Sequence, residues 1–196
     1  AMEPDQDGEF TLYQSLPSQT DTVINVTIGG TADPGVDYVA ISTPLTIPAG
    51  ATSAKVPVEV INNPVLEDDE TVVLTLDSIA SGDFDVSLST MPGPLMDTVF
   101  IYDDDDALLS IMTTADAAEP DTDGEFTLTL TEIADTDTVV TLMVSGTATP
   151  GSDYVTLPMT VTIPAGSTQT TVDVTVIDDA LEEGTETVTV TLSLWP

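Results

Sequence analysis

The feature that most constrains the fold of this chain is an internal repeat. Residues 3–80 align with residues 119–196 without a gap, and nearly half of the aligned positions are identical. The segment EPDQDGEFTL (residues 3–12), for example, returns as EPDTDGEFTL (residues 119–128). A repeat of this length is a whole domain rather than one turn of a solenoid. The sequence therefore predicts two domains of one fold, a first repeat over residues 1–105 and a second repeat over residues 106–196.

Both repeats have the residue pattern of β-strands. Thr and Val, which are β-branched and suit a pleated surface, are abundant throughout the chain. Apolar and polar side chains alternate with a period of two in residues 22–28, 168–177 and 186–194. Pairs such as Pro-Gly and Ala-Gly separate these runs about every ten residues, and no helical stripe is present. This pattern predicts an all-β fold, a sandwich of short antiparallel strands.

The two repeats differ at their ends. A strand-like run at residues 107–113 precedes Glu119 in the second repeat, whereas only two residues precede Glu3 in the first. The first repeat continues through a long loop into a final strand at residues 98–102, which has no counterpart in the second. We therefore expect each repeat to lack one terminal strand. Two explanations compete: the chain is part of a longer array, or neighbouring chains supply the missing strands.

Charge and composition exclude several classes of function. The formal net charge is -34, Lys55 is the only basic side chain, and the chain has no His and no Cys. Without a basic patch, nucleic acid and anionic membranes are repelled. Without His or Cys, catalytic triads and zinc sites built on these residues are excluded, whereas hard cations such as Ca²⁺ need only oxygen ligands. The sequence contains no apolar run of 18 or more residues, so no membrane-spanning segment is predicted.

A series of motifs appears in the same order in each repeat. The first repeat has an acidic residue at Glu3, the turn GTADPGVDY (residues 30–38), Pro48-Ala-Gly50, the pair Glu67 and Glu70, and the acidic run at residues 103–106. The second repeat has the same set up to Glu186. This series resembles the Calx-β (Calx-beta) family, first described in sodium–calcium exchangers and common in large surface proteins. The resemblance implies two tandem immunoglobulin-like sandwiches, often with Ca²⁺ bound at one end.

The resemblance also implies a set of calcium ligands. Several carboxylates within one nine-residue loop repel one another unless a cation neutralises their charge. Ca²⁺ does so and binds six to eight oxygen ligands. In the first repeat the implied ligands are Glu3, Asn62, Asn63, Glu67, Glu70, Asp103, Asp104 and Asp105. In the second repeat they are Glu119, Asp178, Asp179, Glu183 and Glu186. Asn62 and Asn63 supply no charge, which should weaken calcium binding in the first repeat. The second repeat has no terminal acidic run, however, so we expect calcium to stabilise the first repeat more.

Other interpretations of the same residues stay open. The acidic loops are also consistent with a solvated surface that maintains solubility, and Asp21 and Asp137 lie outside the motifs. The Asp-Tyr pair of each turn is expected to be structural, with the Asp capping backbone N–H groups and the Tyr packed behind. Glycines of the same turns are expected to supply backbone geometry. Glu67 and Glu70 could act as an acid–base pair, but no nucleophile or cleft motif accompanies them, so no enzymatic activity is expected.

Two functions remain. The first is a calcium-binding tandem module of an extracellular or cell-surface adhesive protein, with Ca²⁺ stiffening the acidic linker at residues 102–107. The second is a calcium-independent structural spacer or fibre subunit that assembles head to tail by β-strand addition between copies of the chain. Secretion or surface display is an expectation of both, although no signal segment begins the sequence.

Overall fold

The computed structural model describes residues 1–89, 95–178 and 184–193, and all regular secondary structure in these ranges is β-strand. The chain forms two compact units. The first comprises Ala1–Asn63 and Asp68–Asp104, and the second comprises Pro64–Glu67 and the residues from Asp105 onward. Nowhere in the described chain is there a helix that could span a membrane.

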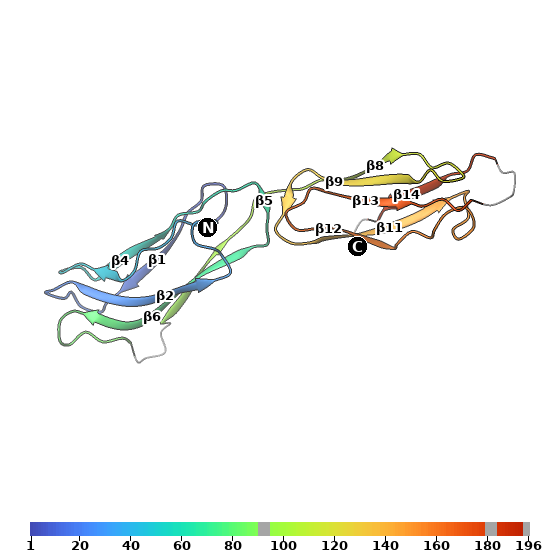
Figure 1. The fold of residues 1–196 in the computed structure, drawn as a ribbon. Helices are drawn as coiled ribbons and strands as arrows, with labels where there is room; N and C mark the ends of the chain where they lie inside the picture. The colour runs from blue at the N-terminus through green and yellow to red at the C-terminus, as the bar shows by residue number, and fades with distance from the viewer. Residues whose placement is uncertain (90–94, 179–183, 194–196) are drawn as a thin grey trace. The chain divides into compact units, whose positions relative to one another are not determined.

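The first unit is a two-layer sandwich (Figure 1). One sheet pairs β1 with β4, and the other has the order β3-β2-β6-β7. Its strands are β1 (Gly8–Tyr13), β2 (Thr22–Gly30), β3 (Leu45–Ile47), β4 (Ser53–Val58), β6 (Glu70–Ser81) and β7 (Met96–Ile101). All of these pairs are antiparallel, as the alternating sequence predicts.

The second unit repeats this plan with a different set of edge strands. One sheet has the order β13-β9-β8 and the other the order β12-β11-β14, while β5 and β10 form a short parallel pair. The strands are β5 (Val65–Leu66), β8 (Leu109–Ala115), β9 (Gly124–Leu130), β10 (Ile133–Ala134), β11 (Thr138–Gly146), β12 (Thr160–Ile163), β13 (Gln169–Val174) and β14 (Val188–Leu192). The sequence predicts only antiparallel strands, so the parallel β5–β10 pair is a departure from that prediction. Both segments are two residues long and lie outside the alternating runs, so no alternation marks them as strands.

Alternation along the strands fills a separate core in each unit. Phe10 and Leu12 of β1 are buried while Thr11 between them is not, and Leu128 and Leu130 of β9 follow the same rule. Burying a side chain of this size contributes about 1.5–3 kcal/mol relative to leaving it in water. Two cores built in this way allow each unit to fold without disulfides.

The missing terminal strands are confirmed within the described residues. β8 of the second repeat has no counterpart beside β1, and β7 of the first repeat has no counterpart beside β14. The N-terminal residues of the first repeat instead form two isolated bridges, between Met2 and Tyr102 and between Met2 and Gln6. The two repeats therefore share a common sandwich and differ at one edge each.

Candidate metal centre

The N-terminal turn places Glu3 inside the protein. Met2 and Gln6 exchange backbone hydrogen bonds of 2.8 and 2.9 Å, which close a tight turn around residue 3. The backbone N–H of Glu3 then donates to the carbonyl oxygen of Tyr102 at 3.0 Å. This bond ties Glu3 to the segment that follows β7, and it leaves the Glu3 side chain only 3% exposed. A buried carboxylate is costly unless other groups compensate its charge, so its surroundings are informative.

The acidic run after β7 approaches Glu3 with alternate residues. Asp103 and Asp105 are half-buried, whereas Asp104 and Asp106 are exposed. An extended chain points successive side chains in opposite directions, so the period of two divides the run into an inner and an outer pair. The inner pair, Asp103 and Asp105, faces the side on which Glu3 lies.

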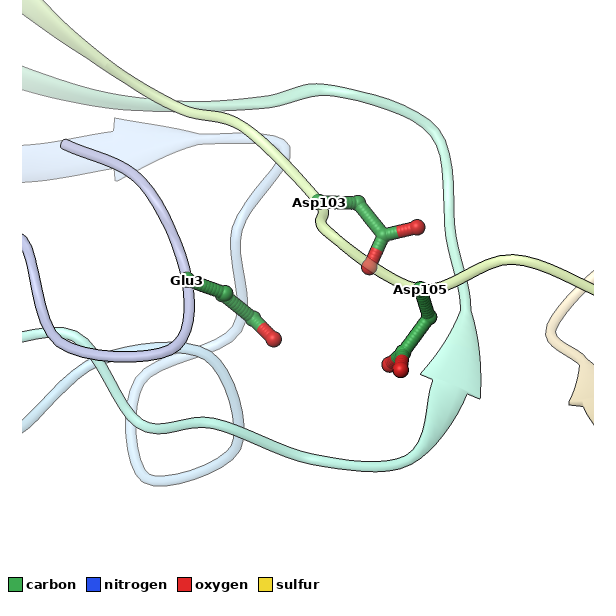
Figure 2. Close-up of side chains that lie close together, drawn as sticks. All are labelled: Glu3, Asp103 and Asp105. Carbon is green, nitrogen blue, oxygen red and sulfur yellow. The ribbon is translucent and has the colours of Figure 1, made fainter.

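Figure 2 shows the side chains of Glu3, Asp103 and Asp105 converging on a common space. One carboxylate oxygen from each residue lies within 4.8 Å of an oxygen from each of the others. Two oxygens that both bind Ca²⁺ at about 2.4 Å can be at most about 4.8 Å apart. All three carboxylates are therefore close enough to share one coordination sphere, and their oxygen chemistry fits a hard cation.

The electrostatics of this acidic trio (Glu3, Asp103 and Asp105) favour a cation. Asp103 Oδ1 and Asp105 Oδ2 are both shielded from solvent, which weakens the screening of their charges by water. The one basic side chain of the sequence, Lys55, pairs instead with Glu9 at 2.9 Å. That pair is exposed, and Glu9 raises the pKa of the Lys55 ammonium through a hydrogen bond and its charge. Lys55 therefore has its charge partner on β1.

Comparison with known proteins identifies the family. The sequence model of the Calx-beta domain matches this chain twice, over residues 2–106 and 103–195. The chain belongs to the Calx-beta family. Both the resemblance and the fold class predicted from the sequence, a tandem pair of all-β sandwiches, are thereby confirmed. Calx-beta domains are binding modules rather than catalytic ones, and none of the curated proteins compared with the chain matches it.

Solved structures of Calx proteins resemble the chain. One is the calcium binding domain CBD12 of CALX1.1, which is 20% identical over 91% of this chain and 72% of that chain, with a TM-score of 0.43. CBD12 from CALX1.2 is 21% identical over 89% of this chain and 70% of that chain, also with a TM-score of 0.43. The apo-form Calx CBD1 domain is 28% identical over 53% of this chain and 88% of that chain, with a TM-score of 0.42.

The remaining predicted ligands of the first Calx-beta repeat do not belong to the trio. The backbone N–H of Asn63 donates to Glu3 Oε2 at 3.5 Å, which brings the 62–70 loop to the buried carboxylate. Asn62 is exposed, and Glu67 and Glu70 are half-buried. Neither of these Glu residues belongs to the group of carboxylates within 4.8 Å of one another, and nor does Asp104. Their role as calcium ligands stays a prediction.

The second Calx-beta repeat presents its predicted ligands differently. Glu119, the counterpart of the buried Glu3, is exposed, and so are Asp178 and Glu186. Glu119 and Glu186 line one groove of the sandwich. Asp179 and Glu183 lie outside the described residues. Within the described part of this repeat, no three carboxylates approach as closely as the acidic trio does.

The Asp-Tyr turns have the structural role that the sequence predicts. Asp37 is 3% exposed and accepts a hydrogen bond from the backbone N–H of Asp33, and Asp153 does the same for Thr149. Tyr38 packs into the core behind its turn at 2% exposure. Burial raises the pKa of the Tyr38 hydroxyl, and the neighbouring carboxylate of Asp37 raises it further. These residues hold the loop ends in place and are not candidate ligands.

Several acidic residues outside the motifs also have a structural role that the sequence interpretation missed. They accept backbone N–H groups at 2.9 Å in equivalent positions of the two repeats: Asp21 from Ala49, Asp137 from Ala165, Asp7 from Val60 and Asp123 from Val176. Asp21 and Asp137, which the sequence alone places on a solvated surface, fasten the Pro-Ala-Gly turns through these hydrogen bonds. The sequence does contain a signal for this structural role, because an Asp stands at the equivalent position of each repeat.

Proposed function

We propose that this chain is a calcium-binding tandem Calx-beta module, and that the first repeat binds Ca²⁺ through Glu3, Asp103 and Asp105. The observation that carries the proposal is the approach of these three carboxylates within 4.8 Å of one another, with Glu3 buried. Residues 100 positions apart in the sequence meet there, so the fold itself assembles the site. A random acidic surface would have no reason to bury one member.

The charge of the trio suits a divalent ion. Three carboxylates carry about three negative charges, and a bound Ca²⁺ would offset most of them. They can supply three to six oxygens, and Ca²⁺ completes a shell of six to eight with carbonyl, amide or water oxygens. Asn62, Asn63, Glu67 and Glu70 remain the residues from which we expect further ligands.

Calcium held in this way also has a mechanical consequence. Asp103 and Asp105 belong to the segment that leads into the second repeat, and four successive Asp residues repel one another without a cation. Binding should therefore order this linker. Small-angle scattering with calcium and with chelator measures the effect: a decrease in flexibility supports it, and an unchanged flexibility contradicts it.

A role outside the cell is part of the same proposal. Extracellular calcium modules work with dissociation constants of about 10⁻⁴–10⁻³ M, a range suited to a partly hydrated site. The high negative charge maintains solubility in such a setting. Adhesive or structural work at a cell surface is the function we infer from these properties.

Isothermal titration calorimetry tests the calcium site. The double variant Asp103→Asn/Asp105→Asn should lose the tightest binding event of the chain. The matched control Asp104→Asn/Asp106→Asn removes the same charge from the outer pair of the same segment and should retain that event. Equal loss in both variants would show that calcium responds to the net charge of the run and not to the trio. Titration with Mg²⁺ in place of Ca²⁺ should give weaker binding, because the smaller ion demands stricter geometry.

A further inference from the structure

The turn that buries Glu3 holds a second segment of the first repeat at two points. Glu3 Oε2 accepts the backbone N–H of Asn63 at 3.5 Å. Asp7, which directly follows the same turn, accepts the backbone N–H of Val60 through Oδ1 at 2.9 Å. Both carboxylates therefore hold residues 60–63, the segment that leads into the predicted calcium loop.

The two carboxylates differ in their surroundings. Glu3 is buried and belongs to the acidic trio, whereas Asp7 is exposed and is not among the carboxylates that lie within 4.8 Å of one another. A hydrogen bond to an ionised acceptor is about twice as strong as one between neutral groups. At 2.9 Å the Asp7 bond is also the shorter of the two, so Asp7 is the firmer anchor of the segment.

The segment is fixed on its other side by the turn at residues 30–38. Val60 forms an antiparallel bridge with Tyr38. Beside it, the Ile61 N–H donates to the carbonyl oxygen of Asp37 at 2.9 Å. Successive N–H groups of an extended chain point to opposite sides, so the Val60 N–H faces away from this bridge and reaches Asp7 instead. Without Asp7, one side of the segment would lose its strongest contact.

The second repeat has the same contacts without a buried glutamate. Asp123, the counterpart of Asp7, accepts the Val176 N–H at 2.9 Å, and the Ile177 N–H donates to the carbonyl oxygen of Asp153 at 2.9 Å. Glu119, however, is exposed. The aspartate thus makes the same hydrogen bond in both repeats, and only in the first does the segment that it holds also contact a member of the trio.

We propose that Asp7 is a positioning residue of the calcium site: by fixing Val60, it keeps the following residues in contact with Glu3 and so sets the place of the Glu3 carboxylate before the ion binds. The inference rests on the proposed binding of calcium by the acidic trio. A ligand that is already in place need not be ordered by the ion, and the fraction of molecules in the binding conformation sets the apparent affinity. Replacing residues that orient metal ligands without touching the metal typically weakens metal binding by about 10–100-fold.

Isothermal titration calorimetry of single variants, at near-physiological salt and well below the melting temperature, tests the proposal. Asp7→Ala removes the acceptor and should weaken the tightest calcium-binding event by about tenfold. Asp7→Asn removes the same charge but keeps an oxygen that accepts the Val60 N–H, so its affinity should stay within about threefold of the wild type. Asp123→Ala removes the same hydrogen bond from the second repeat and should leave this event unchanged.

Hydrogen exchange and melting, both measured in chelator, separate positioning from stability. Amide exchange should become faster at Val60 in Asp7→Ala and at Val176 in Asp123→Ala, because each variant loses the hydrogen bond to that N–H. The two variants should lower the melting temperature of their own repeats by similar amounts. A purely structural Asp7 would show these changes without any change in calcium affinity.

Three results would overturn the proposal and leave the calcium site intact: wild-type affinity in Asp7→Ala, equal weakening in Asp7→Asn and Asp7→Ala, or equal weakening in Asp123→Ala. The second of these would mean that only the charge of Asp7 matters. A different result would overturn the proposed function and this inference together. It is a wild-type chain whose calcium binding is unchanged by Asp103→Asn/Asp105→Asn.

Discussion

Replacing one inner aspartate of the acidic trio should have opposite effects with and without calcium. Asp103→Asn removes a negative charge that lies within 4.8 Å of the carboxylates of Glu3 and Asp105. Without calcium the substitution relieves repulsion and should stabilise the first repeat. With calcium it removes a charged ligand and should lower the stabilisation that the ion provides. A change of sign of this kind is not expected from a residue with only a packing role.

The size of the first effect follows from Coulomb's law. Two unit charges 4.8 Å apart repel by about 3.5 kcal/mol at an effective dielectric constant of about 20. Asp103 and Asp105 are half-buried, so water and salt reduce this energy. We therefore expect a gain of about 1–2 kcal/mol in chelator, or an increase of about 4–16 °C in melting temperature for a domain of this size.

The size of the second effect follows from linkage. An ion that binds only the folded state stabilises it by about 2.7 kcal/mol when its concentration is one hundred times the dissociation constant. The variant should lose most of this increment. Differential scanning calorimetry of the wild-type chain, Asp103→Asn and the outer-face control Asp104→Asn, each in chelator and in calcium, measures both effects. Destabilisation of the chain by Asp103→Asn in chelator, or the same behaviour of Asp104→Asn and Asp103→Asn, would show that the trio neither repels nor binds calcium as described.

Three further predictions concern stability. Gly30→Ala should destabilise the first repeat by about 2 kcal/mol or more in urea unfolding, since Gly30 has φ of 119° and an added Cβ would lie 2.0 Å from Thr71 O, whereas Gly29→Ala, with open space around it, should change little. Val72→Ala should lower the unfolding free energy by about 2 kcal/mol and Val188→Ala by clearly less, because Val72 on β6 is fully buried and Val188 on β14 is only half-buried. Hydrogen bonds from the Gln19 N–H and the Thr20 hydroxyl lower the pKa of Asp83, so its stabilisation is present above pH of about 4 and is lost as the pH falls through the lowered pKa; Asp83→Asn should therefore show a shallower loss of stability in urea titrations between neutral and acidic pH.

Much of the fold could be predicted from the sequence, because the repeat and the period of two are both visible in it. The repeat predicts two sandwiches of one plan, and the unmatched segments at 98–102 and 107–113 correspond to β7 and β8. Sequence alternation could not reveal the two-residue strands β5 and β10. Segments this short carry no periodicity, and their pairing depends on tertiary contacts.

The candidate site could be predicted in composition but not in detail. Glu3, Asp103 and Asp105 are all among the predicted ligands, since acidic loops at one end of a sandwich converge. The predicted set also contains Asp104, which the structure leaves exposed and outside the trio. Distinguishing Asp104 from its neighbours requires knowing which face of the extended run meets Glu3, and that depends on the hydrogen bond between Glu3 and Tyr102.

A crystal structure of the chain grown in calcium tests whether Glu3, Asp103 and Asp105 together hold a calcium ion. Anomalous difference density distinguishes Ca²⁺ from water and from a lighter ion. We expect one such peak in the first repeat, at about 2.3–2.6 Å from carboxylate oxygens of all three residues. Well-ordered carboxylates in this place without a peak between them, or a calcium ion bound only elsewhere in the chain, would contradict it.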